Sequence, residues 1–171
     1  MRPIFSILLF SFLVSSCRHQ AAIAKEIFPP QVGDTRYVAQ LDDSAFHLCR
    51  PGFSLQYYNT RSWFKDHKRD IEQYFHERYK APQGRNAGKQ TGWLTIRFII
   101  NCEGRTGWFR LSGIDSEYQP FHFSQKVSAQ LLTLTKALQG WQPATYNNQI
   151  YDSYQYVTFK LKKGAIECIL P

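Results

Sequence analysis

The stretch GWLTIRFIINCEGRTGWFRL, from Gly92 to Leu111, predicts two strands that fold back on each other across Glu103-Gly104. Apolar and polar side chains alternate along its first half, with the period of two that is typical of a strand with one buried face. The residues expected on that face are Leu94, Ile96, Phe98, Ile100 and Cys102, followed after the turn by Phe109 and Leu111. Gly104 accepts the positive φ that a tight β-hairpin needs.

An amphipathic helix is expected before the hairpin and another after it. The first runs from Trp63 to Tyr79 and the second from about Ser124 to Gln139. Gly140 then stands where a glycine commonly terminates a helix. A last long strand follows from Tyr151 to Lys162. The residues expected on its buried face are Val157, Phe159 and Leu161.

These elements predict an α+β fold in which two helices pack on one face of a small antiparallel sheet, in the order helix, strand, strand, helix, strand. The second helix would cross over the sheet and place the last long strand beside the first strand of the hairpin. The tail GAIECILP, residues 164–171, is a candidate fourth strand that turns back after Lys163-Gly164. In that strand Ile166 and Leu170 would share one face, and Glu167 and Ile169 the other.

The N-terminus indicates export. An almost unbroken apolar run from Ile4 to Val14 follows Arg2, and it is too short to remain as a membrane-spanning helix. The run ends in Val14-Ser15-Ser16-Cys17, which resembles a bacterial lipobox. The alternative is an ordinary secretory signal with an incidental cysteine. We expect Cys17 to become the lipidated first residue of the mature protein.

The expected organisation is a lipoprotein signal peptide over residues 1–16, a tether over 17–37 and one domain over 38–171. The mature chain has room for a single core. An irregular segment from Phe46 to Asn59, with one candidate short strand, begins the domain. The protein is expected in the cell envelope, with the domain in the periplasm and the choice between inner and outer membrane left open.

The chain carries a formal net charge of +8 and has a pI of about 9.4. In a cytosolic protein such a charge would suggest nucleic acid, but export removes that partner. Anionic lipid head groups, lipopolysaccharide or cell-wall polymer remain as counter-charges. Most of the charge is expected to form an ordinary solvated surface.

Besides Cys17, the chain has Cys49, Cys102 and Cys168, which gives one disulfide and one free thiol in an oxidising compartment. Spacing alone does not choose among the three pairings. We favour Cys49–Cys102, because Cys102 ends a core-facing strand and Cys49 lies in the irregular segment that can be fastened to that end of the sheet. Cys168 is then the free or alternative thiol.

The sequence contains no motif that predicts a metal, a cofactor or a catalytic centre. The cysteines form no CxxC pair, and no His-x-His cluster accompanies them. Glu72 and His76 share one face of the first helix, but a pair at that spacing is more often a solvated contact. No GxSxG, HExxH or P-loop occurs. We therefore expect a protein without catalytic activity and without cofactors.

Two motifs resemble the TonB C-terminal domain family. GWLTIRFIINCEGRTG, residues 92–107, is similar to the family's strand, acidic-Gly turn and strand, and LQGWQPATYNNQIYDSYQYVTFKL, residues 138–161, is similar to its closing pattern. The resemblance covers about Ile71 to Leu161 and is closest to lipoproteins of the Bacteroidota type. The residues that carry the match are Gly92, Gly104, Trp141, Pro143 and Phe159.

The resemblance implies a binding module, because in TonB-like domains the last strand lies at a sheet edge where a receptor's extended peptide adds on as a further strand. It also implies that Trp141 anchors the turn from the second helix into the last strand. The sequence departs from the transducer in lacking a retained transmembrane helix and a long proline-rich arm, and in carrying the tail 164–171. A tail strand would occupy the edge that a receptor peptide needs.

The face of the sheet without helices is the candidate binding surface. The aromatic and basic residues expected on it are Trp93, Arg97, Trp108, Arg110, Tyr154, Tyr156 and Lys160. Contiguous exposed aromatics often mark an interaction site, although coincidence explains the pattern equally well.

Two functions follow from these observations. The first is a non-catalytic, membrane-anchored envelope protein that binds a protein or peptide partner, in an adaptor role linked to outer-membrane transport. The alternative is a cell-wall or lipid-surface binding domain that uses the basic aromatic face. An enzyme is a distant third.

The lipobox prediction has a direct test. The wild-type protein should incorporate labelled palmitate and fractionate with membranes, and Cys17→Ala should do neither, because the acceptor sulfur is gone. A Cys17→Ala variant that still carries the label and stays with membranes would contradict lipidation at Cys17.

Overall fold

The computed structural model describes residues 35–59, 64, 68–84 and 87–170. The predicted signal peptide 1–16, the lipidation site Cys17 and most of the tether therefore lie outside the described residues. Thr35 to Tyr37, the end of the predicted tether, already pack on the domain, with Thr35 buried. Within the described part, no helix has the length and apolar character needed to cross a membrane.

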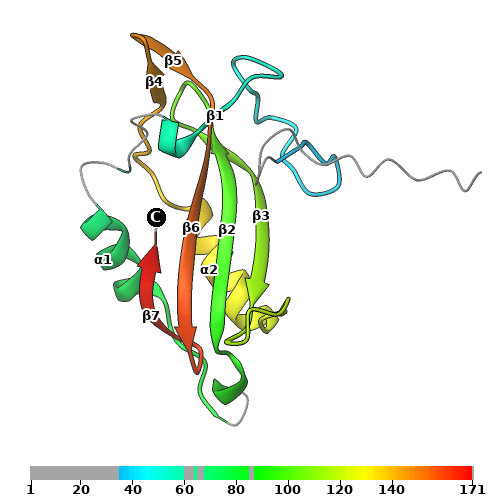
Figure 1. The fold of residues 1–171 in the computed structure, drawn as a ribbon, viewed down its shortest axis with the longest axis vertical. Coiled ribbons are helices and arrows are strands. Elements are labelled where there is room, and N and C mark those ends of the chain that lie inside the picture. Colours follow the sequence, from blue (N-terminus) through cyan, green and yellow to red (C-terminus); the bar gives the residue numbers. More distant parts are fainter. Residues whose placement is uncertain (1–34, 60–63, 65–67, 85–86, 171) are drawn as a thin grey trace, which may run out of the picture.

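The described chain forms a mixed α+β fold (Figure 1). Its elements are β1 (Leu55–Gln56), the short 3-10 helix η1 (Tyr57–Asn59), α1 (Lys68–Arg78), a second 3-10 turn η2 (Ala87–Lys89), β2 (Gly92–Ile100), β3 (Thr106–Ile114), α2 (Gln125–Lys136), β4 (Ala144–Tyr146), β5 (Gln149–Tyr151), β6 (Ser153–Lys162) and β7 (Ala165–Leu170). The order differs from the predicted one in the small β4–β5 hairpin, which follows the second helix, whereas β1 lies in the segment 46–59 where the sequence offered one candidate short strand. Both elements are too short to show a periodic pattern in the sequence.

The main sheet has the strand order β1-β6-β2-β3, and β7 also pairs with β6. β2 lies between β3 and β6 and is antiparallel to both, so the last long strand lies beside the first strand of the hairpin, as predicted. β1 runs parallel to the beginning of β6, and β7 runs antiparallel to its end. The outer edge of β6 is therefore shared by two short strands.

Both helices cover one face of this sheet, and α2 lies behind it in Figure 1. Ile71 and Phe75 of α1 and Leu131 of α2 are buried in the same cluster as the core-facing residues of β2 and β6. Phe75 is fully buried and meets Phe159 edge to face, with 4.7 Å between the ring centroids. Leu111 lies opposite Ile96 on this face but is 39% exposed, because β3 is the edge strand.

The second helix is shorter than predicted, and Phe64, which was expected in the first helix, instead forms an isolated β-bridge with Trp141. α1 is described only from Lys68, and residues 60–63 and 65–67 of the predicted helix lie outside the described residues. α2 ends at Lys136, and just beyond it the Leu138 N–H closes a tighter turn on the Thr135 carbonyl oxygen. Leu138 nevertheless remains in the core.

Trp141 anchors the turn after α2. Its ring is 5% exposed and meets Phe98 edge to face at a centroid distance of 5.2 Å. Gly104 of the β2–β3 turn lies so close that an added Cβ atom would be 2.7 Å from the Trp141 carbonyl oxygen. The two sequence motifs that resemble the TonB family thus contact each other in the fold.

The predicted tail strand is present as β7, but a β-bulge changes which side chains face the core. Lys160 pairs with Cys168 and Leu161 pairs with Ile166, so Glu167 is the extra residue. Ile169 is consequently buried and Ile166 packs on the core, whereas Leu170 is 40% exposed. The predicted alternation, with Ile166 and Leu170 on one face, was wrong because it assumed an unbulged strand.

Cys49 and Cys102 form a disulfide with a Cα–Cα distance of 6.0 Å, as predicted, and Cys168 is a free, half-buried thiol. Asp152, just before β6, holds the main chain at both ends of this disulfide. Its Oδ1 accepts the N–H groups of Cys49 and Cys102, each at 3.1 Å, and its Oδ2 accepts that of Arg50 at 2.8 Å. The side chain is fully buried, so these bonds replace its hydration.

Asp152→Asn should test the importance of this carboxylate. The amide keeps one accepting oxygen but places an NH₂ group against an N–H donor, which leaves a buried polar group without a partner. We expect the free energy of unfolding, measured by urea denaturation of the oxidised protein, to fall by about 2–4 kcal/mol.

Asp43→Asn is the matched control, because Asp43 is exposed and accepts only a local bond from the Ala45 N–H. Its effect should stay below about 1 kcal/mol. Equal denaturation midpoints for the two variants would contradict the special role of Asp152.

Candidate functional site

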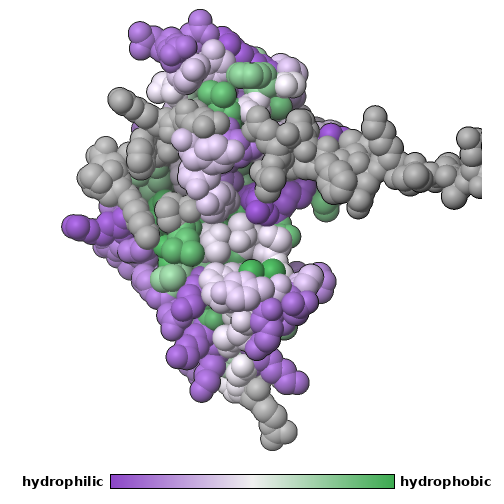
Figure 2. Space-filling view, viewed as in Figure 1, coloured by the Kyte–Doolittle hydropathy of each residue, from purple (hydrophilic) through white to green (hydrophobic). Residues whose placement is uncertain are grey.

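The N-terminal part of the described chain, residues 35–59, crosses the helix-free face of the sheet; we call it the belt. Phe46 of the belt is buried against Gly107 of β3, where an added Cβ atom would collide with the phenyl ring. Ile99 of β2, which also points to this face, is fully buried. The apolar side chains that reach the surface in Figure 2 lie in separate patches among hydrophilic ones. The belt therefore covers part of the face that the sequence predicted to be exposed.

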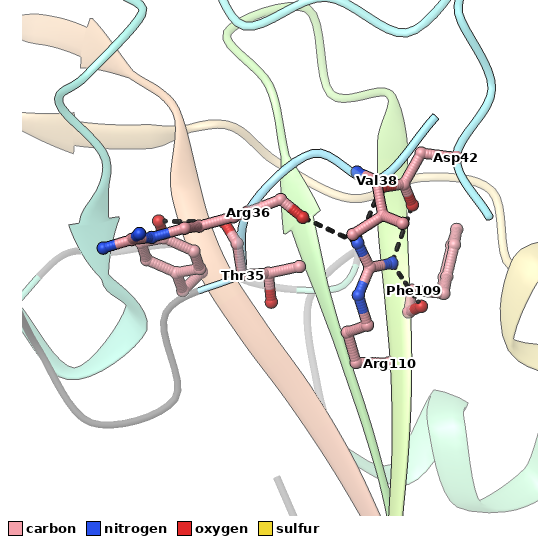
Figure 3. Close-up of polar contacts among 7 residues, drawn as sticks. Thr35, Arg36, Val38, Asp42, Phe109 and Arg110 are labelled. Carbon is pink, nitrogen blue, oxygen red and sulfur yellow. Dashed lines mark hydrogen bonds and ion pairs between the residues drawn. The ribbon is translucent and has the colours of Figure 1, made fainter. Parts of the chain in front are cut away.

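Arg110 of β3 fastens the belt to the sheet (Figure 3). Its guanidinium donates to both carboxylate oxygens of Asp42, at 2.7 and 2.6 Å, and to the carbonyl oxygen of Arg36 at 2.7 Å. Asp42 also accepts the Val38 N–H, and its side chain is only 1% exposed. The hydrogen bonds from Arg110 hold the pKa of Asp42 below its ordinary value of 3.8, although burial opposes this shift. The guanidinium of Arg110 thus holds the belt against the sheet.

Trp108 also holds the belt. Its φ of +54° falls where the register between β2 and β3 shifts, which indicates a β-bulge. Its ring packs between Tyr37 and Phe46 of the belt, at centroid distances of 5.9 and 6.1 Å. Its Nε1 is buried without a hydrogen-bond partner in the described part of the chain. In this structure Trp108 therefore packs against the belt, and its predicted binding role stays a prediction.

Three of the predicted residues meet in one pocket. Arg97, Tyr154 and Tyr156 line a cavity of about 260 Å³ together with Gln56, Gln155 and two belt residues, Tyr57 and Tyr58. The Tyr57 and Tyr156 hydroxyls are hydrogen-bonded at 2.8 Å, and their rings meet edge to face. Tyr58 is 67% exposed. We call this cavity the tyrosine pocket.

Sequence reasoning missed the contribution of Tyr57 and Tyr58. The signal was present as two adjacent tyrosines at the end of the candidate short strand. No local pattern, however, shows that this segment pairs with β6, about 100 residues later in the chain. Only the parallel pairing of β1 with β6 brings the two tyrosines onto the helix-free face.

Trp93 and Lys160 lie at the opposite end of the face, in a separate pocket of about 230 Å³. Trp93 stacks on Tyr118, with 5.2 Å between the ring centroids. Lys160 forms an ion pair with Glu167 at 2.7 Å, which raises the pKa of the lysine and lowers that of the glutamate. The structure therefore brings Arg97, Tyr154 and Tyr156 together in one pocket, which the other four predicted residues do not line.

The tyrosine pocket lies beside an interruption in the outer edge of β6. β1 pairs with β6 as far as Tyr154, and β7 pairs from Thr158 onward. Alternation along the strand places the N–H and C=O groups of Tyr156 on the same outer side. There the Tyr156 N–H donates to the side-chain oxygen of Gln155 at 2.9 Å, and no described strand pairs with it. Within the described ranges, neither β1 nor β7 pairs with this single-residue stretch, which we call the edge gap.

Cys49, Cys102 and Asp152 have their sulfur and carboxylate atoms within 4.8 Å of one another. The two sulfurs are bonded to each other, and the carboxylate accepts three main-chain N–H groups. A metal needs free thiolates and free carboxylate lone pairs, so this cluster is a structural staple and not a metal site.

Comparisons of this chain with protein-family models, with curated proteins and with solved structures gave no match. Functional inference therefore depends on the geometry of the tyrosine pocket and the edge gap.

The two arginines that face each other across β2 and β3 should respond differently to substitution. Arg110→Gln removes the partner of buried Asp42 and should lower the free energy of unfolding by about 2–3 kcal/mol. Arg97→Gln should leave it unchanged or raise it by up to about 1 kcal/mol, because it removes a like-charge pair. Urea denaturation at pH 7 measures both, and a larger loss in Arg97→Gln than in Arg110→Gln would contradict these roles.

The Arg110 contribution should also depend on pH. Because the pKa of Asp42 is lowered in the folded state, the ion pair contributes fully above the ordinary value of 3.8 and is lost as pH falls through the lowered value. The stability difference between wild type and Arg110→Gln should therefore shrink when denaturation is repeated at pH 3 and below. A difference that does not change with pH would show that Arg110 acts only through packing.

Proposed function

We propose that this protein is a non-catalytic, lipid-anchored envelope protein whose periplasmic domain binds an extended segment of a partner protein, as an adaptor linked to outer-membrane transport. The observation that carries the proposal is the edge gap at Tyr156 beside the tyrosine pocket. An unpaired strand edge can accept main-chain hydrogen bonds from a peptide, and an adjacent aromatic pocket can select one of its side chains.

The resemblance to the TonB C-terminal domain supports the same mode of binding, since a peptide would meet the edge of the last long strand. This chain differs from the TonB-like arrangement in one respect, because β7 occupies the edge of β6 from Thr158 to Lys162. A partner would therefore engage one short stretch of β6 and the pocket, instead of forming a long added strand. Such a contact suits a transient adaptor, which must release its partner.

The alternative, a cell-wall or lipid-surface binding domain, needs a continuous basic aromatic face. Two of the cations predicted on that face are already neutralised, Arg110 by Asp42 and Lys160 by Glu167. The belt also divides the aromatic residues into separate groups. These observations favour a protein partner over an extended anionic surface.

Photo-crosslinking can test the proposal. The purified domain, with p-benzoylphenylalanine in place of Tyr58, is irradiated with envelope fractions and the adducts are digested with protease or with lysozyme. We expect a discrete adduct that protease removes and lysozyme does not.

Tyr146 on β4 is the matched control, because it is 53% exposed and lies outside the tyrosine pocket. The same photo-reactive residue at Tyr146 should give no such adduct. Equal adducts at both positions would contradict a specific site, and a lysozyme-sensitive or lipid-extractable adduct at Tyr58 would favour the alternative function.

A further inference from the structure

Arg97 lies in the middle of β2 and faces another arginine. Its Cα partner in β3 is Arg110, and its partner in β6 is Tyr156. Like charges directly opposite each other on adjacent strands are destabilising. Asp42 compensates only one of the two, because both of its oxygens accept bonds from Arg110. Among the described residues, one cation of this pair therefore has no counter-charge.

The remaining contacts of Arg97 are weak. Its Nη1 lies 3.3 Å from the Ser112 hydroxyl oxygen, slightly beyond the usual range for an N–H···O hydrogen bond. Across the described ranges no carboxylate forms an ion pair with it. A half-buried guanidinium with unused donors is suited to bind a planar anion such as a carboxylate.

The other walls of the tyrosine pocket are compatible with an anion. Burial raises the pKa of Tyr156 to about 12, with a further contribution from its bond to Tyr57. The phenol therefore remains neutral and can donate a hydrogen bond at physiological pH. No described acidic side chain lines the pocket. Arg97 consequently gives it a net positive charge.

The edge gap lies next to this charge. A residue added opposite Tyr156 would point its side chain to the same helix-free face as Tyr156 and Arg97. That residue and Arg97 would be separated by two strand spacings, roughly 10 Å. The long side chains of a glutamate and an arginine together can span such a distance. The Gln155 oxygen that now accepts the Tyr156 N–H would be displaced by the main chain of the ligand.

We propose that the tyrosine pocket is a carboxylate-binding subsite, in which Arg97 and the neighbouring tyrosine hydroxyls hold an acidic residue of an extended peptide whose main chain meets Tyr156 at the edge gap. This inference rests on the proposed function and adds the chemical class of the partner. The carboxylate can belong to an acidic side chain or to a chain terminus, and the two sources differ in their response to amidation.

Fluorescence polarisation with four labelled pentapeptides tests the proposal. The probes are Thr-Val-Glu-Val-Thr and Thr-Val-Gln-Val-Thr, each with a free or an amidated C-terminus. We expect the glutamate peptide to bind about tenfold more tightly than the glutamine peptide, as a charge-assisted contact predicts. In Arg97→Gln this ratio should fall to about one. If the glutamate and glutamine peptides bind equally and amidation weakens both, the carboxylate is that of a chain terminus.

Lys160→Gln is the matched control, because it also removes one positive charge from the same face but lies outside the pocket. It should keep the tenfold preference, whereas loss of the preference in this variant would show a general charge effect and overturn the inference. Equal binding of all four peptides to wild type would also overturn it while leaving peptide binding at the edge gap intact. Failure of every peptide to bind would contradict the proposed function itself.

Discussion

The buried carboxylate of Asp152 connects three parts of the chain that are far apart in sequence. It binds the N–H groups of Cys49 and Arg50 in the belt and that of Cys102 in the β2–β3 turn, while its own residue leads into β6. A buried charge is tolerated only when it is fully hydrogen-bonded, so each of these segments must be in place for the others to be stable. The Cys49–Cys102 disulfide makes the same connection covalently. The position of the belt, and of the tyrosines that it carries, depends on this junction.

Arg97 and Arg110 occupy equivalent positions on one face of the sheet but differ in their contacts. Both are half-buried, and they occupy paired positions on neighbouring strands. Asp42 of the belt forms an ion pair with Arg110, whereas no described carboxylate forms one with Arg97. Natural proteins accept such local destabilisation mainly where function needs an unsatisfied group. The difference in ion pairing between these two arginines is therefore more informative about the candidate site than the net charge of the whole chain is.

The regular elements could be predicted because each carries its own periodic signal. Alternation in β2 and β6 identified their core faces, and Trp141 and the Cys49–Cys102 pair were placed correctly. The belt could not be predicted, since its contacts with the sheet are non-local and residues 35–59 have no repeating pattern. The same limitation applies to the site. Arg97, Tyr154 and Tyr156 followed from strand alternation, whereas Tyr57 and Tyr58 and the covering of Trp108 depend on where the belt lies.

The outer edge of β6 brings these features together. Exposed strand edges invite unwanted pairing, and proteins usually cover them. Here β1 covers the beginning of the strand, β7 covers its end, and the side chain of Gln155 satisfies the one N–H between them. A glutamine side chain is easier to displace than a strand, because it holds a single hydrogen bond and no adjacent ladder. The edge is thus protected against another copy of the sheet, while a partner that supplies a main chain together with a group for the tyrosine pocket can still compete.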